Sequence, residues 1–79
     1  MYYVYILRSL KDESRYIRVT TDLKRRMREH NLGNANYTST KRPFKLIWYC
    51  AFSGKQIAFD FEQYLKSSSG YAFTKKHLV

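Results

Sequence analysis

Five polar side chains in this sequence are of the types that hydrolyse a phosphodiester bond. They are two tyrosines, an arginine, a histidine and a glutamate, at Tyr5, Tyr16, Arg26, His30 and Glu62. A carboxylate can hold a divalent cation that polarises a phosphate, a phenol or an imidazole can move a proton, and a guanidinium can stabilise developing negative charge. These residue types therefore allow phosphodiester hydrolysis, provided that the fold brings them together.

Each of these residues also has a simple structural explanation. The two tyrosines can be packing residues, because the chain contains eight tyrosines and a tyrosine ring buries a large apolar area. Arg26 can pair with Asp22 one helical turn earlier, and Glu62 with Lys66 one turn later, each pair contributing only a few tenths of a kcal/mol. The histidine suits a helix C-terminus without any catalysis. Residue types and spacing alone leave catalysis the less favoured interpretation.

The N-terminal part of the chain is typical of a β-hairpin. Tyr2 to Arg8 and Arg15 to Thr20 are rich in β-forming residues, and a polar segment separates them. Successive side chains of a strand point to opposite faces of the sheet. When the aliphatic faces of the two strands are matched, Tyr5, Tyr16 and Arg18 lie on the same side.

A helix is predicted from about Asp22 to His30, with Thr21 and Asp22 supplying its N-terminal cap. Its periodicity makes Leu23 and Met27 the buried stripe and puts Arg26 and His30 at the edge of that stripe. Three cationic side chains point away from the stripe and are expected to face phosphates: Lys24, Arg25 and Arg28.

The segment from Asn31 to Pro43 is polar and without periodicity, so it is predicted to be a long loop, with Gly33 ending the helix before it. Loops of that length are usually functional or mobile. It ends in the basic pair Lys41 and Arg42. The third strand is expected from Lys45 to Phe52, and its apolar composition favours a central place in the sheet.

A second helix is predicted from about Gly54 to Ser67, with Ser53 and Gln56 forming a capping box. Its expected buried residues are Ile57, Ala58, Phe61, Tyr64 and Leu65, with Glu62 at the margin of that stripe. A serine-rich break then precedes a short final helix from Tyr71 to Leu78. The predicted fold is α+β: one domain over residues 1–79, with a three-stranded antiparallel sheet flanked by helices in the order ββαβα plus a short C-terminal helix.

Composition narrows the classes of function. The chain has 15 Lys and Arg against 6 Asp and Glu, a formal charge of +9, which favours a polyanionic partner. Its one cysteine excludes an internal disulfide and argues against a zinc site. The apolar run at the N-terminus is short and broken by Arg8, so neither a signal peptide nor a membrane span is expected. A cytoplasmic location fits best.

Four motifs together resemble the GIY-YIG endonuclease superfamily over nearly the whole chain. They are Tyr3-Val4-Tyr5, Tyr16-Ile17-Arg18, the helix segment DLKRRMREHN, and RPFKLIWYCAF leading into AFDFEQYLKSSSG. The chain looks most like small stand-alone proteins related to the N-terminal nuclease domain of the excision-repair protein UvrC. Each motif is short, and the set of them carries the resemblance.

The resemblance implies DNA hydrolysis with a single divalent ion, Mg²⁺ or Mn²⁺. Tyr5 and Tyr16 match the two motif tyrosines, one of which helps to deprotonate or position the attacking water. Arg26 matches the arginine that contacts the scissile phosphate, and His30 matches the Tyr or His one turn later. Glu62 matches the metal-binding carboxylate.

The chain departs from the family pattern at two positions. Arg18 stands where the second motif ends in glycine, and Val19 stands where UvrC-like domains have a lysine. The Arg18 side chain either fills the place of water or phosphate beside Tyr16, or supplies the charge of the missing lysine. The missing glycine also raises the question whether this backbone has a positive φ, which would strain an arginine.

The sequence therefore leads us to expect a metal-dependent DNA endonuclease that acts in DNA processing or repair. One alternative is a catalytically degenerate nucleic-acid-binding module, because of Arg18, and another is a basic domain that docks on a partner protein. No membrane association is expected, and the sequence leaves open whether a protein partner or a homo-oligomer supplies specificity. The expected nucleic-acid contacts are Arg18, Lys24, Arg25, Arg28, Lys41, Arg42 and Lys66.

Overall fold

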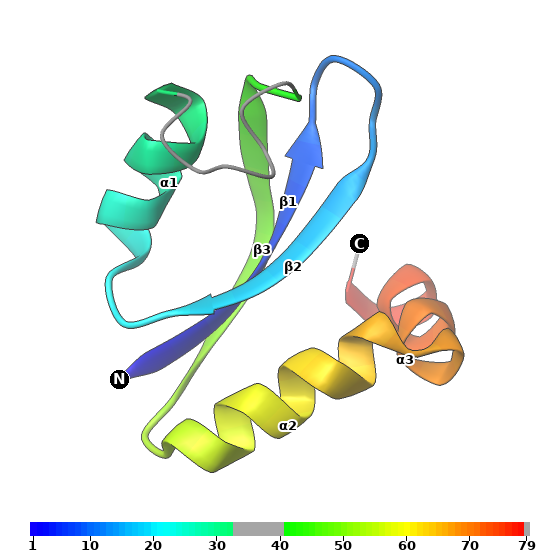
Figure 1. The fold of residues 1–79 in the computed structure, drawn as a ribbon. Coiled ribbons are helices and arrows are strands. Elements are labelled where there is room, and N and C mark those ends of the chain that lie inside the picture. Colours follow the sequence, from blue (N-terminus) through cyan, green and yellow to red (C-terminus); the bar gives the residue numbers. More distant parts are fainter. Residues whose placement is uncertain (33–40, 79) are drawn as a thin grey trace.

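The computed structural model describes residues 1–32 and 41–78. Its elements, in chain order, are β1 (Tyr2–Ser9), β2 (Arg15–Thr20), α1 (Leu23–Leu32), β3 (Phe44–Phe52), α2 (Lys55–Lys66), α3 (Ser68–Phe73) and a short π-helix, η1 (Thr74–Leu78) (Figure 1). The predicted α+β fold and its element order are confirmed. The predicted helix stop at Gly33 and most of the predicted loop lie outside the described residues. Asn31 and Leu32, predicted to begin that loop, are instead the last residues of α1.

The strands form one antiparallel sheet in the order β2-β1-β3. The prediction that the third strand is central was therefore wrong. The central strand is β1, whose side chains from Val4 to Leu7 are completely buried because the strand is covered on both faces. On β3, in contrast, Tyr49 is 54% exposed, and the register shifts opposite Ile6 and Leu7. An apolar run thus indicates a strand without fixing its place in the sheet.

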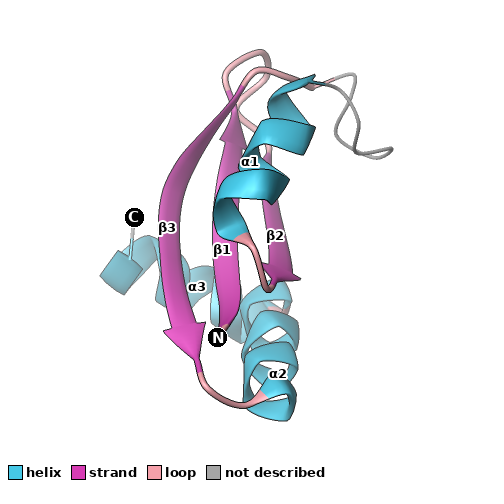
Figure 2. Cartoon of the chain, turned by 90° about the vertical axis from the view of Figure 1, so that its left-hand side faces the viewer, coloured by secondary structure: helices cyan, strands magenta, loops and turns pink. Residues whose placement is uncertain are grey.

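The two faces of the sheet carry separate apolar clusters. Tyr5, Leu7 and Phe44 form one cluster, against which Tyr16 and the α1 residues Leu23 and Met27 pack. The cluster on the other face is formed by Val4 and Ile6 of β1 with Ala58 and Leu65 of α2. This confirms the predicted alternation of side chains between the two faces of the sheet, since Tyr5 and Tyr16 share the face that α1 covers. Figure 2 shows α1 in front of the sheet and α3 behind it.

Helix α1 begins one residue later than predicted, because Asp22 is its cap. The Asp22 carboxylate accepts a hydrogen bond from the Arg25 backbone N–H at 3.1 Å, and the Asp22 carbonyl accepts one from Arg26 at 3.1 Å. The backbone N–H of Asp22 donates in turn to the Thr20 hydroxyl at 3.1 Å. The cap therefore joins the end of β2 directly to the start of the helix.

The predicted capping box of the second helix is wrong. Gly54 is the N-cap of α2 and makes no side-chain cap bond, while the Gln56 amide donates to Asp60 one turn later at 2.9 Å. Two residues of the predicted buried stripe are also exposed, Ile57 at 60% and Tyr64 at 41%. The stripe is narrower than predicted because α2 lies along the β1 and β2 side of the sheet and leaves these side chains in solvent.

The serine-rich segment does not separate two distant helices. The Ser67 hydroxyl accepts a hydrogen bond from the Gly70 N–H at 3.1 Å and so caps α3, which begins at Ser68 instead of the predicted Tyr71. A run of serines resembles a linker in sequence, but one hydroxyl at the right position starts a helix. None of the helices formed by residues 1–32 and 41–78 is long and apolar enough to cross a membrane.

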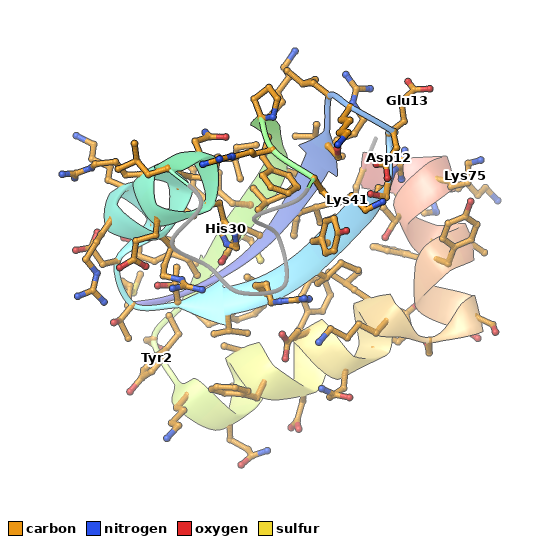
Figure 3. All side chains as sticks on the ribbon, turned by 45° about the horizontal axis from the view of Figure 1, so that its top comes forward. Tyr2, Asp12, Glu13, His30, Lys41 and Lys75 are labelled. Carbon is orange, nitrogen blue, oxygen red and sulfur yellow. The ribbon has the colours of Figure 1, made fainter. Side chains whose placement is uncertain are left out.

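Ser9 connects the β1–β2 turn to the segment before β3. Its buried hydroxyl accepts hydrogen bonds from the backbone N–H of Lys11 at 3.1 Å and of Asp12 at 3.4 Å, and it donates to the Lys41 carbonyl at 2.5 Å. The Lys41 ammonium lies 2.6 Å from the Asp12 carboxylate, and Figure 3 shows these two side chains meeting above β2. One side chain of β1 thus holds two turns together.

Gly70 allows α3 to pack against the end of α2. A Cβ at this position would overlap the Tyr64 carbonyl oxygen and lie 2.5 Å from the Leu65 Cα, and neither backbone atom can move aside cheaply. We predict that Gly70→Ala lowers the free energy of unfolding by about 2 kcal/mol or more, as measured by urea denaturation followed by circular dichroism. Gly54→Ala is the control, because the nearest atom to its Cβ is Ile57 Cδ1 at 3.9 Å, and it should cost less than about 1 kcal/mol. Equal losses would contradict the described packing of α3.

Candidate active site

A hydrogen bond between Tyr5 and His30 lies at the centre of the candidate site. The Tyr5 hydroxyl is 3.1 Å from His30 Nε2, and the two rings meet edge to face with centroids 6.1 Å apart. Tyr5 is 0% exposed and His30 is 1% exposed. Figure 3 shows the His30 side chain on the sheet side of α1. The two residues were predicted as catalytic from separate motifs, and the fold brings them into direct contact.

Both members of this pair are uncharged near neutral pH. Burial raises the pKa of the Tyr5 phenol, and the nearby Arg26 and Arg18 guanidinium groups offset only part of that increase. Burial also lowers the pKa of the His30 imidazole, and the positive charges of Arg26 and Arg18 lower it further. A proton can therefore be relayed through the pair, one entering as another leaves, without creating two buried charges.

Arg26 lies beside the pair, one helical turn before His30. Its guanidinium donates to the Glu29 carboxylate at 2.6 Å, so the simple alternative of a side-chain pair with Asp22 is not what forms. About a third of the Arg26 side chain is exposed. A phosphate could therefore approach this guanidinium from solvent, whereas Tyr5 and His30 lie behind it.

Tyr16 joins the site through Phe44. The Tyr16 ring meets the Phe44 ring edge to face at 5.6 Å, and Phe44 meets the His30 ring at 5.8 Å. The Phe44 backbone N–H donates to the Asn31 side-chain oxygen at 2.7 Å, which ties the start of β3 to the end of α1. Sequence reasoning gave Asn31 no role, although it stands directly after His30 in the matched helix segment.

Arg18 is accommodated without backbone strain. Among the non-glycine residues of the described segments, Glu13 is the one with a positive φ, so position 18 does not need a glycine conformation. The Arg18 guanidinium lies 5.7 Å from the centroid of the Tyr16 ring, and its Nη1 donates to the Ile17 carbonyl at 2.8 Å. The side chain thus bends around the free edge of β2 and stays close to Tyr16.

Glu62 reaches the same region from α2. It is only 6% exposed, and its carboxylate lies 3.2 Å from the Lys66 ammonium, as the simple i,i+4 alternative predicted. The negative charge of Glu62 contributes to the raised pKa of Tyr5. The fold therefore places Glu62, Arg18 and Arg26 within electrostatic range of the buried phenol.

The residues present fit one kind of metal site. The described residues contain no group of three His, Cys, Asp or Glu side chains able to enclose an ion. A single buried carboxylate is a hard oxygen donor, and Mg²⁺ commonly binds through one or two carboxylates together with water and substrate phosphates. Glu62 fits an ion completed in that way, with Lys66 as its competitor for the carboxylate.

Six of the seven predicted phosphate-binding residues divide into two groups, and the seventh, Arg18, lies beside Tyr16. Lys24, Arg25, Arg28 and Arg42 are exposed. Lys41 and Lys66, in contrast, already pair with Asp12 and Glu62. The exposed residues of α1 face away from the sheet, as predicted, so they can meet an approaching polyanion first. To bind DNA, each of the paired lysines would have to exchange its carboxylate partner for a phosphate.

The sequence as a whole matches the model of the GIY-YIG catalytic domain over residues 1–76. The chain belongs to the GIY-YIG family, as its motifs predicted. It carries a GIY-YIG nuclease-like domain of the kind found in small proteins named UPF0213.

Relatives of similar size support this assignment. The chain is 42% identical over 67 residues to a UPF0213 protein of Haloquadratum walsbyi, covering 84% of this chain and 74% of that protein. It is 38% identical over 79 residues to a UPF0213 protein of Streptococcus agalactiae, covering 95% and 89%. The solution structure of the UPF0213 protein BH0048 from Bacillus halodurans is similar with a TM-score of 0.58 at 38% identity, covering 96% of this chain and 84% of that one.

The lowered pKa of His30 predicts how stability depends on pH. The unfolded chain takes up a proton near pH 6.5, whereas the folded protein does so only at lower pH. The free energy of unfolding is therefore independent of the protonation of His30 well above pH 6.5 and falls as the pH drops through that value, by at most about 1.4 kcal/mol per pH unit. We expect the free energy of unfolding, measured with urea, to fall between about pH 7.5 and 5.5 in wild type.

Two variants identify the residue responsible for this decline. His30→Phe should remove most of it, whereas His77→Gln should leave it unchanged. The carboxyl of Asp12 also has a lowered pKa, through its contacts with Lys41 and Ser14, but it loses its stabilisation only at more acidic pH. A decline in His30→Phe as large as that in wild type would assign the titration to another group.

Proposed function

We propose that this protein is a metal-dependent DNA endonuclease. The observation that carries the proposal is the buried hydrogen bond between Tyr5 and His30 beside the Arg26 guanidinium. It joins, in one place, a buried polar pair and a cation able to bind phosphate, from separate segments of the chain. Burying two polar side chains from a strand and a helix costs free energy unless they are bonded, and packing alone would be served by apolar residues.

Glu62 is the residue that would hold the divalent ion. When bound, Mg²⁺ or Mn²⁺ would supply Lewis-acid stabilisation of the phosphate and of the leaving oxygen. Glu62 is buried, so its charge is poorly solvated, and Lys66 at 3.2 Å now balances it. Lys66 is 40% exposed, so it can turn into solvent when another cation takes the carboxylate.

The two motif tyrosines have different roles in this proposal. Tyr16 is half-buried and Tyr5 is completely buried, so Tyr16 is the phenol that meets the attacking water directly. Tyr5 holds His30 in place. This contact fixes the rotation of α1 about its axis and therefore the position of Arg26. Arg26 then stabilises the negative charge that develops on the phosphate. The exposed cations Lys24, Arg25 and Arg28 would bind flanking phosphates of the DNA.

The test of the proposal is cleavage of labelled DNA. We expect wild type to cut single-stranded, duplex, flap or branched DNA when Mg²⁺ or Mn²⁺ is present. Glu62→Gln should reduce the cleavage rate at least about a hundredfold, because its neutral amide binds a divalent ion poorly, while its affinity for DNA stays near that of wild type. Gln63→Ala is the matched control at the neighbouring exposed position. Cleavage by Glu62→Gln at the wild-type rate would remove Glu62 from the mechanism.

A second candidate function is a non-catalytic nucleic-acid-binding module. The observation that favours it is the Arg18 guanidinium, 5.7 Å from the Tyr16 ring centroid, which occupies space that a glycine would leave to water or phosphate. The same cleavage assay decides between the two functions when Arg18→Gly is included. Cleavage by Arg18→Gly alone would establish a nuclease fold that one side chain holds inactive, and cleavage by wild type would show that Arg18 is tolerated.

The proposed roles of the tyrosines predict different kinetic effects. Tyr16→Phe removes the phenol that meets water and should lower the cleavage rate by roughly a hundredfold or more at neutral pH, with little change in protein stability. Tyr5→Phe removes the hydroxyl that contacts His30 Nε2, so it should lower both the cleavage rate and the free energy of unfolding, the latter by about 1–3 kcal/mol. The measurements are single-turnover cleavage and urea denaturation. A Tyr16→Phe protein with unchanged rate would assign the proton transfer to Tyr5.

A further inference from the structure

A groove of about 480 Å³ runs along the free edge of β2. One wall is the strand itself, and the other comes from the end of α2, from α3 and from η1. The side chains of Ile6, Leu65 and Thr74 form its buried floor. The groove is within the size range of small-ligand sites, and it extends the candidate active site instead of coinciding with it.

The rim of the groove is cationic. Arg15, Arg18 and Lys66 line it, and Glu13 is the one acidic residue among the lining residues. Lys66 pairs with the Glu62 carboxylate at 3.2 Å and would exchange it for a phosphate. Glu13 lies in the turn between β1 and β2 (Figure 3), so the one negative charge is at an end of the groove. An apolar floor with a positive rim is complementary to a nucleotide, which presents an uncharged base and a charged phosphate.

Tyr71 supplies an aromatic surface in the same groove. It is 56% exposed, although it is one of the largest side chains in the wall, and Lys75 Nζ lies 5.6 Å from its ring centroid. Exposed tyrosine rings bind unpaired bases by stacking, largely regardless of the base. The neighbouring lysine adds a further positive charge for a phosphate.

The groove is continuous with the candidate active site. Tyr16 and Arg18 belong to both, since they line the groove, the Tyr16 ring packs on Phe44, and the Arg18 guanidinium lies 5.7 Å from the Tyr16 ring centroid. A DNA strand with its scissile phosphate near Tyr16 would therefore continue along β2. Arg15 is the next cationic position on that strand in the direction of the turn.

We propose that this groove binds a nucleotide beside the scissile phosphate, with its base against Tyr71 and its phosphates on Arg15 and Lys66. The inference rests on the proposed function and adds Arg15 and Tyr71, to which the sequence gave no role. The charges alone would also suit an acidic peptide, but a peptide gives no reason for an exposed aromatic ring beside a cationic rim.

The test is binding without cleavage. Wild-type protein in EDTA is titrated into a fluorescent oligothymidylate, and separately into an abasic oligomer of the same length, with affinity read from fluorescence anisotropy at several salt concentrations. Arg15→Gln should weaken the binding of both oligomers and lower the slope of log affinity against log salt by about one. Lys45→Gln is the matched control, because Lys45 and Arg15 both lie opposite Arg8 on the two edges of the sheet.

The aromatic contact is tested with two variants of Tyr71. Tyr71→Leu should weaken binding of the oligothymidylate roughly tenfold and leave binding of the abasic oligomer unchanged, whereas Tyr71→Phe should bind both as wild type does. Equal losses for both oligomers would overturn the base contact. Equal effects of Arg15→Gln and Lys45→Gln, or displacement of the oligothymidylate by polyglutamate at the same charge concentration, would overturn the site.

The outcomes also separate this inference from the proposed function. If wild type cleaves DNA but Arg15→Gln and Tyr71→Leu bind both oligomers normally, the groove inference fails and the nuclease stands. If wild type neither binds nor cleaves DNA, both fail. If the groove variants lose affinity as expected while wild type does not cleave, the groove is a binding site of a non-catalytic module.

Discussion

The arrangement of the candidate site depends on one polar contact between the sheet and α1. His30 is the buried residue of that helix, and its Nε2 meets the hydroxyl of Tyr5 on the central strand. Apolar contacts through Leu23 and Met27 hold the helix on the sheet, but they are not directional. A hydrogen bond is directional, and an unmet polar group in this place would cost about 1–3 kcal/mol. The bond therefore fixes the rotation of α1 and with it the position of Arg26.

The sequence predicts those parts of the fold that depend on local periodicity. The alternation in β2 places Tyr16 and Arg18 on one face, and the period of α1 places Arg26 and His30 at the edge of the buried stripe. Strand order was not predictable in this way, because both β1 and β3 are apolar runs and only long-range burial decides which is central. The ion pair of Lys41 with Asp12 also joins residues far apart in sequence, and no local pattern contains it.

The helix caps also differ in how far local sequence predicts them, because some depend on tertiary packing. Asp22 was predictable as a cap because aspartate is one of the residues most preferred at the N-cap of a helix. Ser53 and Gln56 match a capping pattern but do not form it, since Gln56 bonds to Asp60 instead. The serine-rich sequence predicts a break at Ser67, whereas in the structure Ser67 caps α3. A serine in a polar run gives several competing possibilities, and packing of Gly70 against the end of α2 decides among them.

The departure from the family motif changes the electrostatics of the site more than its shape. A glycine at position 18 would bring no charge, whereas the guanidinium here lowers the pKa of His30 and opposes the rise in the pKa of Tyr5. Both effects favour a neutral imidazole and a more acidic phenol. The substitution is therefore compatible with proton transfer in this site, and the geometry gives no strain that would argue against it.

The hydrogen bond from Arg18 to the Ile17 carbonyl has a further consequence for how the molecule meets its own copies. Because β2 is an edge strand, its outward carbonyl groups could pair with a strand of another chain, which is the usual route to sheet extension and aggregation. The Arg18 guanidinium hydrogen-bonds to one of these acceptors, the Ile17 carbonyl, and places a positive charge beside it. The residue that replaces the motif glycine thus also protects a very small, tyrosine-rich protein against edge-to-edge association.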